Sequence, residues 1–460
     1  MKVNLVVSAA WTFMSSDDPK AIGIVDKYTS AFTSGYTWTA AYRSHRWDGK
    51  KHFLSKTRGR FPTGLVLIVQ SALENAGYEV TVDYPQEEPD IVKEPSVIGI
   101  ELRDYQLEAI QLGIERKRGI FNMATNAGKT EVMAGLISAL DLPTLCVVHR
   151  KELKEQTFKR FESRLGNVDN IQVEMIQTLH ARRTDKNTKH LLNETKVILV
   201  DECHHLPATT WYNLVQSSPA PYRFGFSGTP LRGRQEITDR DLALVAATGV
   251  PIYEVGNETL IREGVSSKPY VEFHVVSNPQ MWSRMKFDKA YDIGIVQNGT
   301  RNRMILDHMK AEKLEGKKVL VLVQRIAHGE TLSTNSGDSF IHGGTSSQER
   351  HEEFEKFKNG DRSALIASTI LDEGIDVPDI DTLILAGAGK TPWALLQRIG
   401  RGMRWKEGGV LKVIEYLDNM DYPDGVLSRH AESRLKFLEE QEEFDVKVVG
   451  SRSKGLGRLL

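Results

Sequence analysis

The sequence predicts an α/β protein in which a small α/β module at the N-terminus precedes two parallel-sheet lobes. Residues 100–265 and the later part of residues 266–427 alternate short apolar runs with helical stretches, as parallel strands covered by helices do. Polar motifs follow the ends of several of these runs, where parallel sheets bind their ligands. Candidate strands are Gly119–Met123, Thr144–His149, Val173–Ile176, Val197–Val200 and Arg223–Ser227 in the first lobe, and Val319–Val323, Phe340–His342, Ala364–Ser368, Thr382–Ala386 and Val410–Ile414 in the second.

The remaining parts of the chain show no such alternation. Residues 1–82 form a separate unit, with an amphipathic helix expected at Leu65–Gly77. Residues 83–99 are expected to be a linker, since prolines and charges dominate their first part. Residues 256–300 are expected to connect the lobes. Residues 428–460 predict a charged helix followed by a basic, glycine-containing tail.

Composition excludes few classes of function. Sixty Lys and Arg against 61 Asp and Glu give a net charge of −1, so only local clustering can indicate a nucleic-acid partner. Two cysteines, Cys146 and Cys203, are too few for a disulfide framework, which favours a reducing compartment such as the cytoplasm. No apolar run approaches the roughly 20 residues that cross a bilayer, so no membrane partner is expected.

A phosphate-binding loop is predicted at Phe121–Thr130, FNMATNAGKT. A strand that ends in a tight loop and opens a helix gathers backbone N–H groups and the positive end of the helix at one point. Gly128 lets the backbone approach the phosphate oxygens, and Lys129 can reach the β- and γ-phosphates. The Thr130 hydroxyl is placed to hold Mg²⁺. The alternative is an ordinary glycine-lysine turn.

Two carboxylates, Asp201 and Glu202, follow the apolar run at Val197–Val200. They are costly at the end of a buried strand unless a cation or substrate meets them. Opposite a phosphate loop, Asp201 can hold Mg²⁺ and Glu202 can polarise the attacking water. The alternatives are a solvated acidic turn, or a zinc site that uses Cys203 and the histidines after it, for which no second ligand pair has suitable spacing.

Together these motifs resemble those of the superfamily-two helicases and translocases of the DExH type, with Asp-Glu-Cys-His at residues 201–204. Asn126 and Ala127 depart from the family's usual phosphate loop. The resemblance covers about residues 100–417 and implies two tandem RecA-like lobes that bind ATP and Mg²⁺. The other segments that carry it are Leu102–Gln106, Val147–Leu153, Gln177–Leu179, Ser227–Pro230, Val323–Arg325, Ala367–Thr369, Asp372–Pro378 and Gln397–Arg404.

The resemblance also implies roles for individual residues. It assigns ATP binding to Arg103, Gln106, Thr125, Asn126, Ala127, Gly128, Lys129, Thr130, Gly374 and Asp376. It assigns coupling of hydrolysis to strand binding to His204, Ser227 and Thr229. Contacts with the nucleic-acid backbone are expected from Arg150, Gln177, Thr178, Arg325 and Thr369, although an ordinary surface or capping role is open for each.

Catalytic groups are expected from both lobes. Lys129 and Glu202 belong to the first, while Gln397, Arg401 and Arg404 belong to the second. The two arginines are three residues apart, so they can share one face of a helix and act as arginine fingers on the transferring phosphoryl group. ATP would then favour closure of the lobes, and cycles of closure would move a gripped strand. The alternative for both arginines is a solvated basic helix.

The first unit has a basic and aromatic centre at Tyr42–Phe53. Arg46, Lys50 and Lys51 could neutralise phosphates while Trp47 stacks on bases. The alternative is a hairpin that turns near Asp48-Gly49, with its aromatic rings in the core.

Residues 46–50 and 61–64 ahead of a helicase core resemble the N-terminal module of phage UvsW-type recombination helicases. This resemblance implies a DNA helicase that reverses forks and migrates Holliday junctions, working on branched DNA as a monomer or loose oligomer in the host cytoplasm. The alternatives are an RNA helicase and a double-stranded DNA translocase that does not separate strands. A protein that only binds DNA and a metabolic phosphotransferase also stay open, but neither would use all these motifs.

Overall fold

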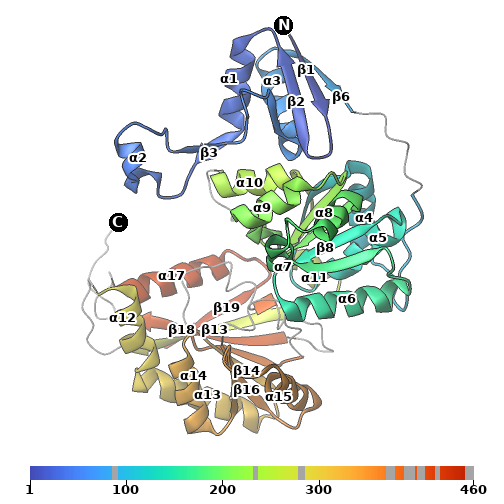
Figure 1. The fold of residues 1–460 in the computed structure, drawn as a ribbon. Helices are drawn as coiled ribbons and strands as arrows, with labels where there is room; N and C mark the ends of the chain where they lie inside the picture. The colour runs from blue at the N-terminus through green and yellow to red at the C-terminus, as the bar shows by residue number, and fades with distance from the viewer. Residues whose placement is uncertain are drawn as a thin grey trace. The chain divides into compact units, whose positions relative to one another are not determined.

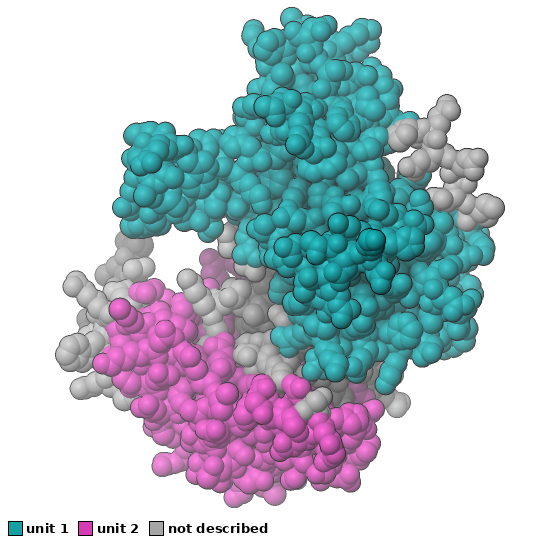
Figure 2. Space-filling view, viewed as in Figure 1, with its two compact units in different colours: residues 1–124, 128–255 teal, residues 125–127, 256–460 magenta. Residues whose placement is uncertain are grey.

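The computed structural model describes residues 1–84, 92–231, 237–277, 285–368, 379–387, 399–400, 410–419 and 425–450. It divides into two compact units, and each is described by itself (Figure 2). The first unit contains residues 1–124 and 128–255, and the second contains residues 125–127 and 256–460. No helix of the described residues is long and apolar enough to span a membrane.

The N-terminal module is a four-stranded sheet covered by two helices (Figure 1). In the strand order β5-β2-β1-β6, β1 is antiparallel to β2 and parallel to β6. The expected helix after residue 65 is α3. The elements are β1 (Lys2–Val7), β2 (Trp11–Ser16), α1 (Pro19–Tyr28), β5 (Arg60–Pro62), a 3-10 turn η2 (Thr63–Leu65), α3 (Val66–Asn75) and β6 (Glu79–Asp83).

An arm, residues 33–49, projects from this module and carries α2 (Figure 1). It joins β3 (Ser30–Phe32) to β4 (Lys50–His52), which form an antiparallel pair of their own. A hairpin that turns at Asp48-Gly49 is therefore wrong, because the partner of β4 lies upstream of the whole arm. The arm contains a 3-10 turn η1 (Tyr36–Trp38) and α2 (Ala40–Arg43).

The first lobe is a six-stranded parallel sheet with the order β12-β7-β11-β10-β8-β9. The predicted strands appear at or within two residues of the expected positions, because each is an apolar run bounded by turns. The strands are β7 (Arg118–Met123), β8 (Thr144–Val148), β9 (Ile171–Met175), β10 (Val197–Asp201), β11 (Tyr222–Ser227) and β12 (Pro251–Val255). The helices are α4 (Asp104–Arg116), α5 (Lys129–Leu140), α6 (Lys151–Leu165), α7 (Ile176–Ala181), α8 (Lys186–Glu194), α9 (Thr209–Ser217) and α10 (Asp239–Thr248).

The module and the first lobe share one hydrophobic core. Gly64 lies so close to α10 that a Cβ there would be 2.0 Å from the carbonyl oxygen of Val245. Polar contacts add to the junction: the Gln216 amide donates to the Ala10 carbonyl at 2.6 Å, and the Arg118 guanidinium donates to the Ala9 carbonyl at 2.8 Å. The module is therefore packed on the lobe by both apolar and polar contacts.

The second unit contains a seven-stranded parallel sheet with the order β15-β16-β14-β17-β18-β13-β19. Strand β13 lies in the segment expected to be only a connection, and β19 in the one expected to be a helix and tail. The strands are β13 (Lys268–Ser277), β14 (Val319–Val323), β15 (Ser339–Ile341), β16 (Ala364–Ser368), β17 (Thr382–Leu385), β18 (Val410–Asn419) and β19 (Asp445–Val449). The helices are α11 (Asn257–Arg262), α12 (Phe287–Tyr291), a π-helical turn (Asp292–Val296), α13 (Gly299–Leu314), α14 (Ile326–Ser336), α15 (Ser347–Asn359) and α17 (Val426–Glu439).

A buried ion pair joins helix α13 to this second sheet. Arg301 of α13 donates to Asp418 of β18, and both side chains are fully buried. The same guanidinium donates to the Ala386 carbonyl and lies 4.8 Å from the centroid of the Tyr416 ring. Such a pair is costly to break on one side only, because the remaining charge stays buried.

Candidate nucleotide site and nucleic-acid contacts

The phosphate loop lies between β7 and α5, as predicted. Gly128 and Asn126 both have positive φ, 77° and 70°, so the loop turns through the left-handed region. A Cβ on Gly128 would be 2.2 Å from Nε2 of Gln106. The turn therefore favours glycine, and any larger residue would also displace the end of the Gln106 side chain. Lys129 and Thr130 begin α5, where N–H groups and the helix dipole favour an anion.

Gln106 lies beside this loop but is already used within α4. Its Oε1 accepts from the Arg103 backbone N–H at 3.0 Å in a capping arrangement, and its side chain is buried. Arg103 is exposed at the N-terminal end of the helix. The structure thus brings Gln106 to the phosphate loop, while its predicted contact with adenine stays a prediction.

Asp201 and Glu202 lie at the end of β10, beside the strand β11 that separates β10 from β7. Glu202 has φ +48°, which is uncommon for a residue other than glycine and is typical of functional sites. Its Oε1 lies 3.9 Å from Nζ of Lys129. The lysine and the acid predicted to act on one nucleotide are therefore neighbours.

The pKa of Asp201 is raised to about 6, first by burial and then by the charge of Glu202, while Lys129 acts in the opposite direction. Two adjacent carboxylates at a buried strand end repel each other unless a cation lies between them and the phosphates. The carboxylate of Asp201 and the hydroxyl of Thr130 are hard oxygen ligands of the kind that Mg²⁺ prefers. These donors fit the predicted ion.

His204, Ser227 and Thr229 form one hydrogen-bonded group with Glu202. The Ser227 hydroxyl lies 3.1 Å from Nδ1 of His204, donates to Glu202 at 3.5 Å and accepts from the Thr229 N–H at 3.2 Å. His204 also lies 3.3 Å from the Glu202 carboxylate. Of the residues predicted to couple hydrolysis to strand binding, His204 and Ser227 thus contact the predicted catalytic acid, and Thr229 reaches it through Ser227.

A row of histidine rings continues from this group towards the predicted strand-binding residues. The ring of His205 lies 4.2 Å from that of His204 and 4.9 Å from that of His149. The backbone carbonyl of His149 accepts from the Gln177 amide at 3.1 Å. Arg150 follows directly and precedes α6. A continuous chain of contacts therefore joins Glu202 to Gln177, and nothing in the sequence indicated the role of His149 and His205 in it.

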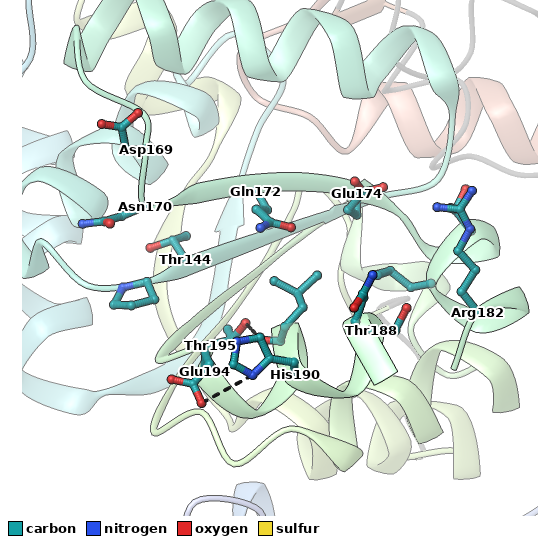
Figure 3. A pocket seen from close by; sticks show the side chains of 15 residues that line it. Thr144, Asp169, Asn170, Gln172, Glu174, Arg182, Thr188, His190, Glu194 and Thr195 are labelled. Carbon is teal, nitrogen blue, oxygen red and sulfur yellow. Dashed lines mark hydrogen bonds and ion pairs between the residues drawn. The ribbon is translucent and has the colours of Figure 1, made fainter. Parts of the chain in front are cut away.

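Thr178 borders a different feature, a cavity of about 490 Å³ beside β9 (Figure 3). Gln172, Glu174 and Arg182 lie along it, and Nδ1 of His190 lies 4.0 Å from the Glu194 carboxylate at its far side. None of the phosphate-loop or acidic-motif residues lines this cavity. The predicted nucleotide site is therefore separate from it.

Most of the second-lobe predictions lie outside the described residues. These are Thr369, Gly374, Asp376, Gln397, Arg401 and Arg404. Arg325 is described: its guanidinium donates to Asp288 at 2.6 Å and lies 5.6 Å from the centroid of the Tyr291 ring. A nucleic-acid phosphate would have to compete with Asp288 for this arginine.

The basic residues predicted in the module lie at the base of the arm and on it. Arg46 is exposed, Lys50 lies 4.9 Å from the Phe32 ring and Lys51 lies 5.4 Å from the ring of Tyr212 in the first lobe. Trp47 is only partly exposed, and its indole N–H donates to the Lys50 carbonyl at 2.8 Å.

The aromatic residue most exposed in the arm is instead Trp38, which sequence reasoning missed. Its presence next to a basic run was the available signal.

A phosphate loop and paired acids at the ends of parallel strands define a P-loop ATPase. Comparison with protein-family models extends this conclusion: residues 99–232 match the res subunit of type III restriction enzymes, and residues 300–406 match the conserved C-terminal domain of helicases. The chain belongs to the superfamily-two helicases of the DExH type. It is an ATP-dependent enzyme of nucleic-acid translocation.

Two relatives and one solved structure illustrate the similarity. The chain is 27% identical over 357 residues to the DNA 3'-5' translocase XPB2 of Sulfurisphaera tokodaii. The aligned region covers 68% of this chain and 81% of that protein. It is 22% identical over 451 residues to the ATP-dependent DNA helicase uvsW of Enterobacteria phage T4, covering 88% and 87%. The DNA-bound type ISP restriction-modification enzyme LlaBIII has a similar fold, with a TM-score of 0.57 at 15% identity over 77% of this chain and 32% of that chain.

Proposed function

We propose that this chain is an ATP-driven DNA helicase that remodels branched DNA, by fork reversal or Holliday junction migration. The observation that carries the proposal is the basic module packed on the motor lobe through a shared core. A motor needs only its two lobes to move along a backbone, so a rigidly attached basic module implies a second DNA contact. Two contacts at fixed separation suit a junction with several arms.

At the nucleotide, each residue of the first lobe has a distinct role. Lys129 leaves Glu202 to bind the β- and γ-phosphates, which frees the Glu202 carboxylate to orient water and accept its proton. Thr130 and Asp201 would hold Mg²⁺, which would neutralise charge on the phosphates. Gln106 and Arg103 would contact the adenine, and Thr125, Asn126 and Ala127 would complete the phosphate loop.

The second lobe supplies the remaining groups in this proposal. Arg401 and Arg404 would act as arginine fingers and Gln397 would orient phosphate or water. Asp376 would approach the ribose, and Gly374 would contribute to ATP binding. An arginine finger is typically worth about 10³–10⁵ in rate. Hydrolysis would therefore depend on closure of the two lobes and would be coupled to movement.

Strand contacts would change with that closure. Glu202 is linked through Ser227 and His204, and then through the histidine rings, to Gln177. Loss of the γ-phosphate would alter the Glu202 contacts and so the hold on the strand. Arg150, Thr178, Arg325 and Thr369 would contact backbone phosphates and carry little sequence information.

The choice of DNA over RNA rests on the basic module and on the DNA-directed relatives, since backbone contacts in the lobes do not distinguish the two. The test is ATP turnover with a four-way junction, a fork, a duplex, single-stranded DNA and RNA of equal length. The junction and fork are expected to stimulate turnover most. Equal or greater stimulation by RNA would overturn the DNA assignment, and equal stimulation by duplex would favour a translocase that does not separate strands.

Two variants separate the motor from the module. Lys129→Ala should abolish turnover on every substrate because it removes the ammonium group that is proposed to bind the β- and γ-phosphates. The triple change of Arg46, Lys50 and Lys51 to Ala should weaken junction binding and flatten its salt dependence by about one unit of slope for each lost phosphate contact. An unchanged slope would mean that these residues have only a structural role.

A further inference from the structure

Trp38 is the most exposed aromatic side chain among the described residues, with 79% of its surface accessible. It ends η1 and is separated from α2 by Thr39 alone, on the arm that stands away from the sheet of the module (Figure 1). An exposed indole on a structured element presents a large, rigid ring face on which another flat ring can stack.

The arm has its own small aromatic core, and this core leaves Trp38 outside. The Tyr36 ring stacks on Phe32 with centroids 4.5 Å apart and meets the Tyr42 ring edge-on at 4.7 Å. Gly49 packs directly against the Tyr36 ring, since a Cβ at residue 49 would lie 2.5 Å from Cδ2 of Tyr36. The outward position of Trp38 is therefore fixed by packing of its neighbours rather than by a loose loop.

Polar contacts hold the base of the arm. His52 lies 2.7 Å from Asp26 and 2.9 Å from Asp48, and Lys56 lies 2.7 Å from Asp26. Burial alone would lower the pKa of His52, but the two aspartates outweigh it and raise that pKa. Trp47 adds its hydrogen bond to the Lys50 carbonyl. These contacts thus fix the C-terminal end of the arm where it returns to the module.

The surroundings of Trp38 are cationic. The Arg43 guanidinium lies 5.5 Å from the centroid of the Trp38 ring and is held there by its bond to the Thr37 carbonyl at 3.1 Å. Arg46 is exposed a turn further on, and Asp48 is the only carboxylate between residues 33 and 52. An occupant of this site must offer both negative charge and a flat ring face, which is the combination that unstacked nucleic acid offers.

We propose that Trp38 stacks on the base exposed at the branch point of DNA, while Arg43 and Arg46 contact the flanking phosphates. This inference rests on the proposed function and specifies how the module selects its substrate. Bases inside a continuous duplex hide their faces from an indole, whereas the last pair before a branch exposes one. Phosphate contacts alone would bind both forms equally well.

The experiment uses the full chain without nucleotide and a fork whose duplex end is closed by a hairpin loop. A 2-aminopurine is placed either beside the branch or eight bases inside the duplex. Wild-type protein should change the fluorescence only beside the branch. Trp38→Ala should lose that change and bind the fork about 5- to 150-fold more weakly, the range for loss of one base stacked on an aromatic ring. Trp38→Phe should retain most of both.

Phe13→Ala is the matched control, because Phe13 is an exposed aromatic of the same module, on β2 and outside the arm. It should bind the fork like wild type. Equal fork affinity for Trp38→Ala and wild type would overturn the inference, and so would an equal fluorescence change at both probe positions in wild type. Should wild-type protein show no DNA-stimulated turnover at all, the proposed function itself would fall instead.

Discussion

Gly64→Ala tests whether the module and the first lobe are one folded unit. The new Cβ would lie 2.0 Å from the Val245 carbonyl oxygen and 2.7 Å from that of Ala246. Atoms of these types do not approach closer than about 3 Å, so the module or α10 must move by about 1 Å. Both neighbours are helix backbone and cannot rotate away as a side chain could.

The expected cost is about 3 kcal/mol, the upper end of the range for overpacking. For a unit of this size each kcal/mol lowers Tm by about 2–4 °C, so the transition of the first unit should fall by about 6–12 °C. Differential scanning calorimetry of the full chain measures this directly. Limited trypsin digestion should also release the module faster.

Gly23→Ala provides the matched control in the same module. Gly23 lies within α1, and a Cβ there would meet nothing within 4 Å. Alanine is a better helix former than glycine by about 0.5–1 kcal/mol, so this change should raise Tm slightly. If Gly64→Ala melts within 2 °C of wild type, as a loosely tethered module would, the shared core is refuted.

Three further predictions concern the site and the second unit. Glu202→Gln should lower the turnover number by about 10²–10⁴ with little change in the binding of a fluorescent ATP analogue, and turnover near wild type would contradict its role as the base. Arg301→Ala should destabilise the second unit by about 3–5 kcal/mol in urea titrations, because Asp418 stays buried without its partner; the double variant with Asp418→Ala should lose less than the sum of the two single changes. Burial, and then Arg301, lower the pKa of His328 to about 3, so between pH 6.5 and about 3 the unfolded chain binds a proton that the folded chain does not. The free energy of unfolding should therefore decrease as the pH is lowered through that window, by about 1.4 kcal/mol per pH unit from this residue. His328→Gln should make this decrease less steep.

Sequence patterns predicted the strands whose burial depends only on their own residues. β7, β10 and β14 are apolar runs between turns, and they lie where expected. β13 is different, since Glu272 and His274 interrupt its apolar pattern. Glu272 lies 3.3 Å from its neighbour His274 and 3.5 Å from Lys412 of β18, so its cationic partner comes from a strand far away in the chain. Such pairing cannot be inferred from the strand itself.

The candidate site followed the same division. Gly128, Lys129 and Glu202 carry motifs whose local geometry is fixed by neighbours in sequence, and the structure places them together. The arm could not be predicted in this way. The composition predicted an aromatic and basic stretch but not which rings are exposed. The packing of Tyr36 against its neighbours leaves Trp38 in solvent, while Trp47 is partly enclosed and hydrogen-bonded.

Helix α10 shows how the shared core limits truncation of this chain and exchange of its N-terminal module. Seven of its residues in succession, from Leu242 to Thr248, are buried, some of them against the module. The two lobes without the module would expose an apolar surface on α10 and would tend to aggregate. The N-terminal module therefore cannot be exchanged freely between related motors. A replacement module would need an α10 whose surface is complementary to it.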